Sequence, residues 1–341
     1  DGRELDLLFQ FDFMDLDGCG GKWNVIPFDL RKLKQLLVRW QEAIDWNTLF
    51  WGNHDQPRAV SRFGSDASEA LRVRSAKMLA AAMYLLRGTP FLYQGEEIGM
   101  TNFPFRDETQ LRDVESLNLL AQARKDGREA WAWNGIRKKG RDNARTPMQW
   151  DASANAGFTA GTPWIDVNPN YRQINVHEAQ ADPDSILHFY RRLLALRQGS
   201  DALRSGTFRL LLPEHPQLLA YERACGEERI RVCCNFSGAP AVLPSEIQGD
   251  CLLCDGVENG RSHTACAACS FCTTDRLCAN QDLHTKKHKK RRRGCHAYPL
   301  RRFSIIKDFR TRAAYHRADA SYNKGWSQAK WQSSNLPANR F

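Results

Sequence analysis

The stretch WNTLFWGNHDQPR, residues 46–58, contains the pattern around which the rest of the chain can be arranged. Residues 49–51 form a short apolar run typical of a buried strand, and the polar residues 53–55 follow it at once. Pro57 disfavours the α conformation in the residue before it, so the turn does not wind directly into a helix. In a barrel of parallel strands, functional side chains lie at the carboxyl ends of the strands. The stretch therefore predicts a buried strand that ends in a functional turn.

The sequence around this stretch alternates between strand-like and helix-like segments. Residues 4–13 form an apolar run of strand length before it, and residues 91–93 form another after it. Residues 27–41 repeat apolar side chains at helical spacing, with basic residues expected on the opposite face. Residues 68–86 form a strongly apolar helix. The order strand, helix, strand, helix, strand predicts part of a barrel of parallel strands.

Three blocks of this sequence resemble signature regions of the α-amylase superfamily, in its oligo-1,6-glucosidase and trehalose-6-phosphate hydrolase branch. The blocks are NHDQPR with VSRFG between residues 53 and 64, GTPFLYQGEEIG at 88–99, and GRDNARTPMQW at 140–150. Three long blocks in the same order make a chance match negligible, and the similarity covers roughly residues 4–245. The resemblance implies the α/β class, with the carboxy-terminal part of a (β/α)8 TIM barrel over residues 1–199.

The chain after the barrel part changes to short apolar runs separated by turns. An amphipathic helix over 184–197 resembles the closing helix of the barrel domain, and a boundary is expected between 198 and 204. The resemblance implies a small antiparallel β-domain next, over residues 200–279. Its expected strands lie at 208–212, 218–221, 230–234 and 241–243.

Residues 100–180 lack a simple period and are rich in Trp, Asn, Gly and Pro. Segments of this length without regular structure are usually functional or disordered. Two interpretations of the tryptophans stay open. They either stack on sugar rings above the barrel mouth, or they pin this excursion to the barrel.

The resemblance assigns roles to three residues of this chain. Asp55 matches a catalytic carboxylate that holds sugar hydroxyls and favours the distorted, oxocarbenium-like state. His54 matches a substrate-binding residue that hydrogen-bonds the same sugar. Arg141 matches an arginine beside the terminal glucose, where a fork of donors can hold a carboxylate and a hydroxyl together.

Two further carboxylates are needed to break a glycosidic bond with retention, a nucleophile and an acid/base. In the resembled family both lie on earlier strands, and neither motif occurs in these 341 residues. Glu96 and Glu97 are an alternative acid pair, but adjacent side chains after a strand diverge, which favours a structural role. The chain also begins without methionine, so we expect an upstream part to be missing and this chain alone to be inactive.

The resulting interpretation is the carboxy-terminal part of a retaining α-glucoside hydrolase of carbohydrate metabolism. Its expected substrates are short α-glucosides, with oligo-1,6-glucosidase-like specificity, and trehalose-6-phosphate hydrolase is the alternative. No cofactor and no metal site are expected in this enzyme. The expected partner is a small oligosaccharide or disaccharide. Without an apolar run of membrane-spanning length or a visible secretory signal, we expect a cytoplasmic monomer.

The formal charge of +10 is distributed unevenly along the chain. From residue 281 to the end, 16 Lys and Arg face three Asp, whereas the rest carries 33 basic and 36 acidic residues. The basicity therefore belongs to a tail over 280–341. It does not indicate a nucleic-acid partner for the enzyme-like part.

Cysteines supply an alternative of another class, because ten of the eleven lie after residue 224. Their spacing is compatible with a zinc ribbon, and a basic run at 286–293 next to it could bind phosphate. Against this zinc and nucleic-acid-binding module, few apolar residues are available to fold around a metal. A third interpretation is that the tail is disordered or frame-shifted. The candidate ligands are Cys251, Cys254, Cys266 and Cys269, with His263 and Cys272 as substitutes.

Overall fold

The computed structural model describes residues 7–244, 247, 250–255, 264–265 and 270–274, the last two ranges by their backbone alone. All of them belong to the first of two units into which the chain divides, residues 1–295. The basic tail predicted over 280–341 lies outside the described residues.

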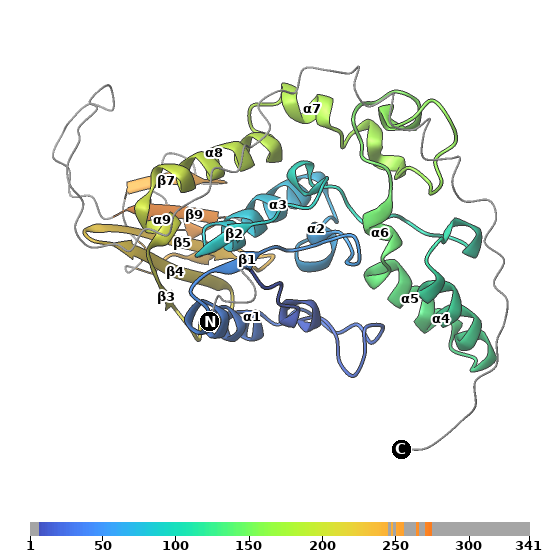
Figure 1. Ribbon diagram of the computed structural model, residues 1–341, viewed down its shortest axis with the longest axis horizontal. Coiled ribbons are helices and arrows are strands. Elements are labelled where there is room, and N and C mark those ends of the chain that lie inside the picture. Colours follow the sequence, from blue (N-terminus) through green and yellow to red (C-terminus); the bar gives the residue numbers. More distant parts are fainter. Residues whose placement is uncertain (1–6, 245–246, 248–249, 256–263, 266–269, 275–341) are drawn as a thin grey trace, which may run out of the picture. The chain divides into compact units, whose positions relative to one another are not determined.

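Two parallel strands, joined through helices, form the barrel part of the described chain. Strand β1 (Asn47–Leu49) pairs with β2 (Gly88–Pro90), so that Asn47 lies opposite Gly88 and Leu49 opposite Pro90. The crossover between them consists of α2 (Ala59–Phe63) and α3 (Glu69–Tyr84), as Figure 1 shows. A parallel pair requires such a crossover. The predicted barrel pattern is confirmed, with both strands starting earlier than the sequence indicated.

Residues 7–11 run beside β1 but are not a strand, in contrast to the strand predicted over 4–13. The Thr48 hydroxyl donates to the Leu8 carbonyl at 2.8 Å, and the ring of Phe9 packs edge-on against Phe50. This contact runs through a side-chain hydroxyl and not through a ladder of backbone amides, so regular strand pairing is not established. The 3-10 helix η1 (Asp12–Asp15) follows.

Helix α1 (Leu30–Ala43) begins at Asp29, whose carboxylate accepts the Arg31 amide at 2.9 Å. Its apolar stripe is buried, as the spacing predicted, and consists of Leu30, Leu33 and Leu37.

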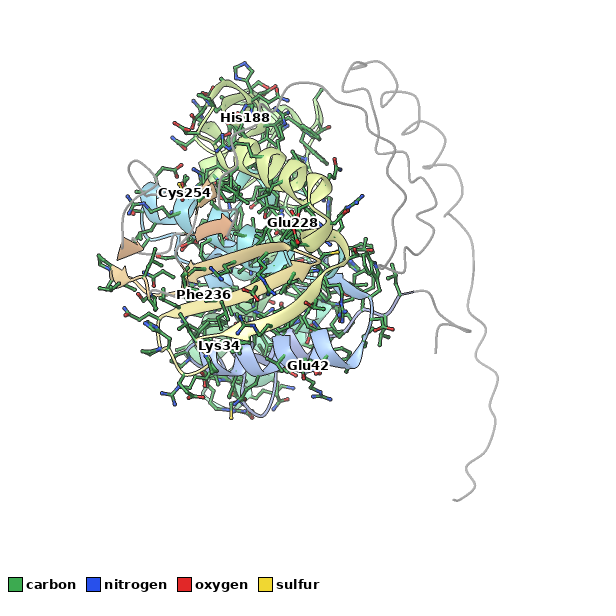
Figure 2. The ribbon with its side chains drawn as sticks, turned by 90° about the vertical axis from the view of Figure 1, so that its left-hand side faces the viewer. Lys34, Glu42, His188, Glu228, Phe236 and Cys254 are labelled. Atoms are coloured by element: carbon green, nitrogen blue, oxygen red, sulfur yellow. The ribbon has the colours of Figure 1, made fainter. Side chains whose placement is uncertain are left out.

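Lys34 contradicts the expectation that the basic residues of this helix lie on its outer face, because it is buried. Its ammonium donates to the carbonyls of Leu212, Pro213 and His215 at 2.7, 3.2 and 2.7 Å. Burial lowers the pKa of Lys34 to about 8. The sequence pattern failed here because the ammonium is solvated by three carbonyls of a loop 178 to 181 residues away. Figure 2 shows α1 beside the strands, with Lys34 labelled.

Helix α3 is the central helix of the described residues and is buried on more than one side. Ser68 caps its first turn by accepting the Leu71 amide at 3.3 Å. On the barrel side, the Trp51 indole donates to the Leu79 carbonyl at 2.7 Å. A helix buried on opposite sides is apolar all round, which explains the weak amphipathic period of this sequence.

The segment 100–180 contains more helix than its sequence suggested. Helices α4 (Val114–Lys125) and α5 (Glu129–Lys139) pack against each other around Leu120 and Ile136. Each shares a small apolar cluster with the other and turns polar side chains outward, so neither has a long apolar stripe. The shorter elements of this segment are η3 (Glu108–Gln110), α6 (Asp142–Arg145), η4 (Ala154–Gly157), η5 (Pro169–Arg172) and α7 (Val176–Ala181), and η2 (Glu96–Ile98) lies just before it.

A second sheet, antiparallel throughout, follows α8 (Ile186–Gly199) and α9 (Asp201–Ser205). The helix predicted over 184–197 is therefore confirmed, and so is the change to antiparallel strands. The five strands in sheet order are β3 (Thr207–Leu211), β4 (Leu218–Cys225), β5 (Glu228–Asn235), β9 (Ser270–Thr274) and β7 (Asp250–Cys254). A separate pair consists of β6 (Ala241–Val242) and β8 (Thr264–Ala265).

Strands β4 and β5 lie against α3, the helix that also covers the parallel strands. The Tyr221 hydroxyl donates to the Ala81 carbonyl at 3.0 Å, and the Arg223 guanidinium to that of Leu85 at 2.7 Å. Both acceptors lie near the carboxyl end of α3, where helix carbonyls have no partner within the helix. Among the described helices, none combines the length and apolar character needed to cross a membrane.

Candidate active site

The turn after β1 is shaped by Asn53. Its side-chain oxygen accepts the Asp55 amide at 2.8 Å, and its carbonyl accepts the Gln56 amide at 3.2 Å. The preceding residues Phe50 and Trp51 are buried, which anchors the base of the turn. Beyond them the side chains of His54 and Asp55 are 72% and 43% exposed, so a ligand can reach both.

The structure brings together the three residues that the resemblance selected. The Nε2 atom of His54 lies 3.3 Å from one carboxylate oxygen of Asp55. The Arg141 guanidinium lies 3.4 Å from the other oxygen of Asp55. The site therefore places a carboxylate, an imidazole and a guanidinium at the carboxyl end of a parallel strand, where a barrel enzyme places its reacting groups.

Arg145 is a fourth member of this cluster that sequence reasoning missed. Its Nη2 donates to Asp55 at 2.7 Å, closer than Arg141, and its Nε donates to the His54 carbonyl at 3.0 Å. The available signal was spacing, because Arg141 and Arg145 are four residues apart and one helical turn puts such residues on one face.

Arg141 is itself fixed by two acidic side chains at the start of α4, earlier in the chain. It donates to the buried carboxylate of Asp113, and its Nε lies 3.5 Å from a Glu115 oxygen. Burial raises the pKa of Asp113, but the hydrogen bond and charge of Arg141 outweigh it, so the pKa is lowered overall. Arg141 is thus held between Asp113 and Asp55.

Buried polar contacts hold the loop that carries both arginines. The Asp142 carboxylate accepts the backbone amides of Arg112 and Asp113 at 2.7 and 2.8 Å. The Tyr93 hydroxyl, just after β2, donates to the Ala144 carbonyl at 3.0 Å. The loop is therefore positioned by the barrel and by the start of α4.

Arg58 connects the His54–Asp55 turn directly to this loop. Its buried guanidinium donates to the carbonyls of Gln94, at 2.6 Å, and Asn143, at 3.2 Å. Burial lowers the pKa of Arg58 to about 10. One side chain thereby connects the turn after β1, the segment after β2 and the loop that carries Arg141 and Arg145.

Glu96 makes contacts that support the structural interpretation over the catalytic one. One of its carboxylate oxygens accepts the hydroxyls of Tyr84, at 2.6 Å, and Tyr190, at 2.8 Å. Desolvation raises the pKa of the half-buried Glu96 to about 7, and the neighbouring Glu97, also half-buried, has a raised pKa for the same reason. Arg58 is a charged neighbour of both.

We expect Glu96→Gln to remove a pH-dependent loss of stability. The pKa of the Glu96 carboxyl is about 7 in the folded protein, against an ordinary value of 4.5. Its contribution to stability is therefore complete below pH 4.5 and is lost as the pH rises to about 7. The glutamine oxygen can still accept both tyrosine hydroxyls. Urea unfolding at pH 4.5 and pH 8 measures this difference. Relative to the parent, the free energy of unfolding of the variant should be higher at pH 8 than at pH 4.5 by up to about 3 kcal/mol.

The matched control is Glu178→Gln, whose parent side chain is exposed. It should show no such gain. If the difference in free energy of unfolding between Glu96→Gln and the parent were the same at both pH values, the raised pKa of Glu96 would be contradicted.

The zinc hypothesis stays a prediction. In the part of the chain that the structure describes, no three His, Cys, Asp or Glu side chains gather in a metal-binding group. Cys251 and Cys254 lie on β7, where burial and the Cys254 thiol raise the pKa of Cys251 to about 12. The other candidates, Cys266, Cys269 and His263, and the basic run 286–293 lie outside the described residues, and Cys272 is described by its backbone alone.

Comparison with known proteins identifies similar sequences. The family model for the α-amylase catalytic domain matches residues 1–206. An oligo-1,6-glucosidase of Parageobacillus thermoglucosidasius is 50% identical over 253 residues, which are 72% of this chain and 45% of that protein. A trehalose-6-phosphate hydrolase of Bacillus subtilis is 45% identical over 258 residues, 73% of this chain and 46% of that protein.

Solved structures are also similar to this chain. The crystal structure of a Bacillus licheniformis trehalose-6-phosphate hydrolase matches with a TM-score of 0.76 and 43% identity, over 80% of this chain and 52% of that one. A trehalulose synthase structure matches with a TM-score of 0.74 and 36% identity, over 80% and 51%. The chain spans about half the length of the curated relatives it matches.

Proposed function

Because the chain belongs to the α-amylase family of glycoside hydrolases, we propose that it forms the carboxy-terminal part of a retaining α-glucoside hydrolase. The observation that carries this proposal is the cluster of His54, Asp55, Arg141 and Arg145 at the end of β1. A carboxylate fixed by two guanidiniums is preorganised to meet sugar hydroxyls and developing positive charge.

Each residue has a distinct role in this proposal. Asp55 binds hydroxyls of the terminal glucose and stabilises the oxocarbenium-like transition state through its charge. His54 binds the same sugar ring from the exposed side of the turn. Arg141 and Arg145 hold the Asp55 carboxylate in place, and Arg141, itself held by Asp113, lies beside the terminal glucose.

The bond-breaking pair is proposed to come from the amino-terminal strands of the barrel. Retaining hydrolysis requires a nucleophile that forms a glycosyl-enzyme bond and an acid/base that first protonates the leaving group and then activates water. Asp55 supplies neither step. Its negative charge lowers the barrier of both, because each passes through a positively charged sugar ring.

Short α-glucosides are the proposed substrates, with oligo-1,6-glucosidase-like specificity. The 50% identity to an oligo-1,6-glucosidase supports this assignment, and the 45% identity to a trehalose-6-phosphate hydrolase keeps that activity as the second candidate. Cytoplasmic location, the monomeric state and the absence of a nucleic-acid partner remain predictions from the sequence. So does the division into domains at residues 199 and 279.

The experiment compares the chain alone with the chain fused behind the amino-terminal part of the Parageobacillus thermoglucosidasius relative. We expect no hydrolysis of p-nitrophenyl α-glucoside by the chain alone, and hydrolysis with retention by the fusion. Isomaltose and trehalose-6-phosphate then distinguish the two candidate substrates. Metal-independent hydrolysis by the pure chain of 341 residues would contradict the proposed division of roles.

A further inference from the structure

Asp17 is a buried carboxylate that has no role in the proposed mechanism so far. It lies just after η1. Arg62 of α2 binds both of its oxygens, since Nε donates to Oδ2 at 2.9 Å and Nη2 donates to Oδ1 at 2.7 Å. Lys139, the last residue of α5, donates to Oδ1 as well. One carboxylate therefore holds two cations that belong to two different helices.

Both cations are as deeply buried as the carboxylate. The side chains of Arg62 and Lys139 are 1% and 3% exposed, against 7% for Asp17. Burial raises the pKa of Asp17, but the hydrogen bonds and charges of Arg62 and Lys139 outweigh it, so the pKa is lowered overall. Apolar residues of similar volume would often stabilise a protein as well as a buried ion pair does. Stability alone is therefore a weak reason for placing three charges here.

Arg62 connects Asp17 to the turn after β1. Its Nη1 donates to the side-chain oxygen of Gln56 at 2.6 Å. Gln56 follows Asp55 directly in the chain. A guanidinium is planar and holds its donors in a fixed fork, so the two bonds to Asp17 also set the direction in which Nη1 points. Asp17 thereby fixes, through Arg62, the residue next to the Asp55 carboxylate.

Lys139 connects Asp17 to the loop that carries Arg141 and Arg145. It precedes Arg141 by two positions, at the end of α5. Arg58 holds the same loop farther along, at the Asn143 carbonyl. The loop is therefore held at two points, one before Arg141 and one between the two arginines.

We propose that Asp17 is a positioning residue of the active site, which sets the distance between the Asp55 carboxylate and the guanidiniums of Arg141 and Arg145. It acts on the turn through α2 and on the loop through α5, and these two helices contact each other (Figure 1). Its burial keeps it from contacting substrate. A displacement of about 1 Å in an active site can cost about a hundredfold in rate. This inference rests on the proposed function where turnover is measured.

The first test is Asp17→Asn in the chain fused behind the amino-terminal part of the Parageobacillus thermoglucosidasius relative. The amide keeps the volume, but it offers Arg62 one acceptor oxygen in place of two and leaves the buried cations without a counter-charge. Turnover on p-nitrophenyl α-glucoside should fall about tenfold or more at a nearly unchanged Michaelis constant. Amide hydrogen exchange should become faster in residues 53–56 and 140–145. The matched control is Asp15→Asn, an exposed carboxylate two positions earlier, which should change neither measurement.

The second test is Gln56→Leu, which leaves the buried ion group intact and therefore keeps the test valid if Asp17→Asn does not fold. Gln56 is half-buried, and the substitution removes an acceptor of Arg62. Turnover should fall about threefold or more at a nearly unchanged Michaelis constant, with faster exchange confined to residues 53–56. In the double variant, the loss should be smaller than the product of the two single losses, because both substitutions act through Arg62.

The outcomes separate this inference from the proposed function. A parent fusion that does not hydrolyse α-glucosides contradicts the proposed function, and hydrogen exchange in the same protein then decides the inference. Unchanged exchange in Gln56→Leu overturns it, and so does a raised Michaelis constant at unchanged turnover. Faster exchange throughout the protein in Asp17→Asn, with Gln56→Leu equal to the parent, would assign Asp17 to stability alone and overturn the inference as well.

Discussion

Asp55→Asn in the fused enzyme is expected to lower turnover at least a hundredfold while the Michaelis constant changes little. The amide keeps the shape of the carboxylate and most of its hydrogen bonding, but it loses the negative charge. That charge acts most strongly when the sugar ring flattens and becomes positive. Its loss therefore raises the free energy of the transition state more than that of the bound ground state. Loss of a preorganised charged group costs on the order of 3 kcal/mol, which corresponds to about a hundredfold in rate.

Steady-state kinetics on p-nitrophenyl α-glucoside measure this split. His54→Ala serves as the comparison and should be milder, because it removes one hydrogen-bonding group on an exposed side chain. A raised Michaelis constant at unchanged turnover in Asp55→Asn would mean that the turn only binds substrate.

Arg223→Met is expected to lower the free energy of unfolding by about 3 kcal/mol or more. The buried guanidinium donates to the carbonyls of Leu85, Gly206 and Thr207, at 2.7, 2.9 and 3.1 Å. Methionine fills a similar volume but leaves these acceptors without a donor, and each unsatisfied buried acceptor costs about 1–3 kcal/mol. The burial that lowers the pKa of Arg223 to about 9 offsets part of this loss, because removing a desolvated charge is itself favourable.

Urea unfolding at pH 7, followed by far-ultraviolet circular dichroism, tests this expectation. Arg209→Met is the matched control, because Arg209 lies on the neighbouring strand β3 with a side chain that is 64% exposed. Arg209 pairs with the buried carboxylate of Glu222, but Glu222 keeps Arg229 and Arg231 as partners, so the control should change stability by less than about 1 kcal/mol. Equal losses in the two variants would show that the three carbonyls find other donors.

The fold of this chain could be predicted where its pattern is local and periodic. The order helix, strand, helix, strand between residues 27 and 93, the closing helix and the antiparallel strands follow from runs of apolar residues with clear periods. The strand predicted over 4–13 was wrong, because residues 7–11 contact β1 through a side-chain hydroxyl and not through a backbone ladder. The helices α4 and α5 could not, because they share a small apolar cluster and lack long stripes. Lys34 could not either, because its acceptors come from a loop far along the chain.

The candidate site could also be predicted only in part. His54, Asp55 and Arg141 could be selected because they stand inside recognisable sequence blocks, and the structure brings them together. Arg145 stands in the same block, yet its contact with Asp55 depends on the loop path that Asp142 and Arg58 set. Contacts of this kind arise from tertiary structure, so spacing alone does not assign them.

The ammonium of Lys34 has a consequence for how such chains can be recombined. Its three acceptors all belong to the segment between β3 and β4, while Lys34 itself belongs to the first barrel helix described here. A foreign β-domain joined to this barrel part would have to present backbone carbonyls at the same place, because a buried cation without acceptors costs several kcal/mol. The path of the segment between β3 and β4 is therefore a condition for exchanging the antiparallel sheet.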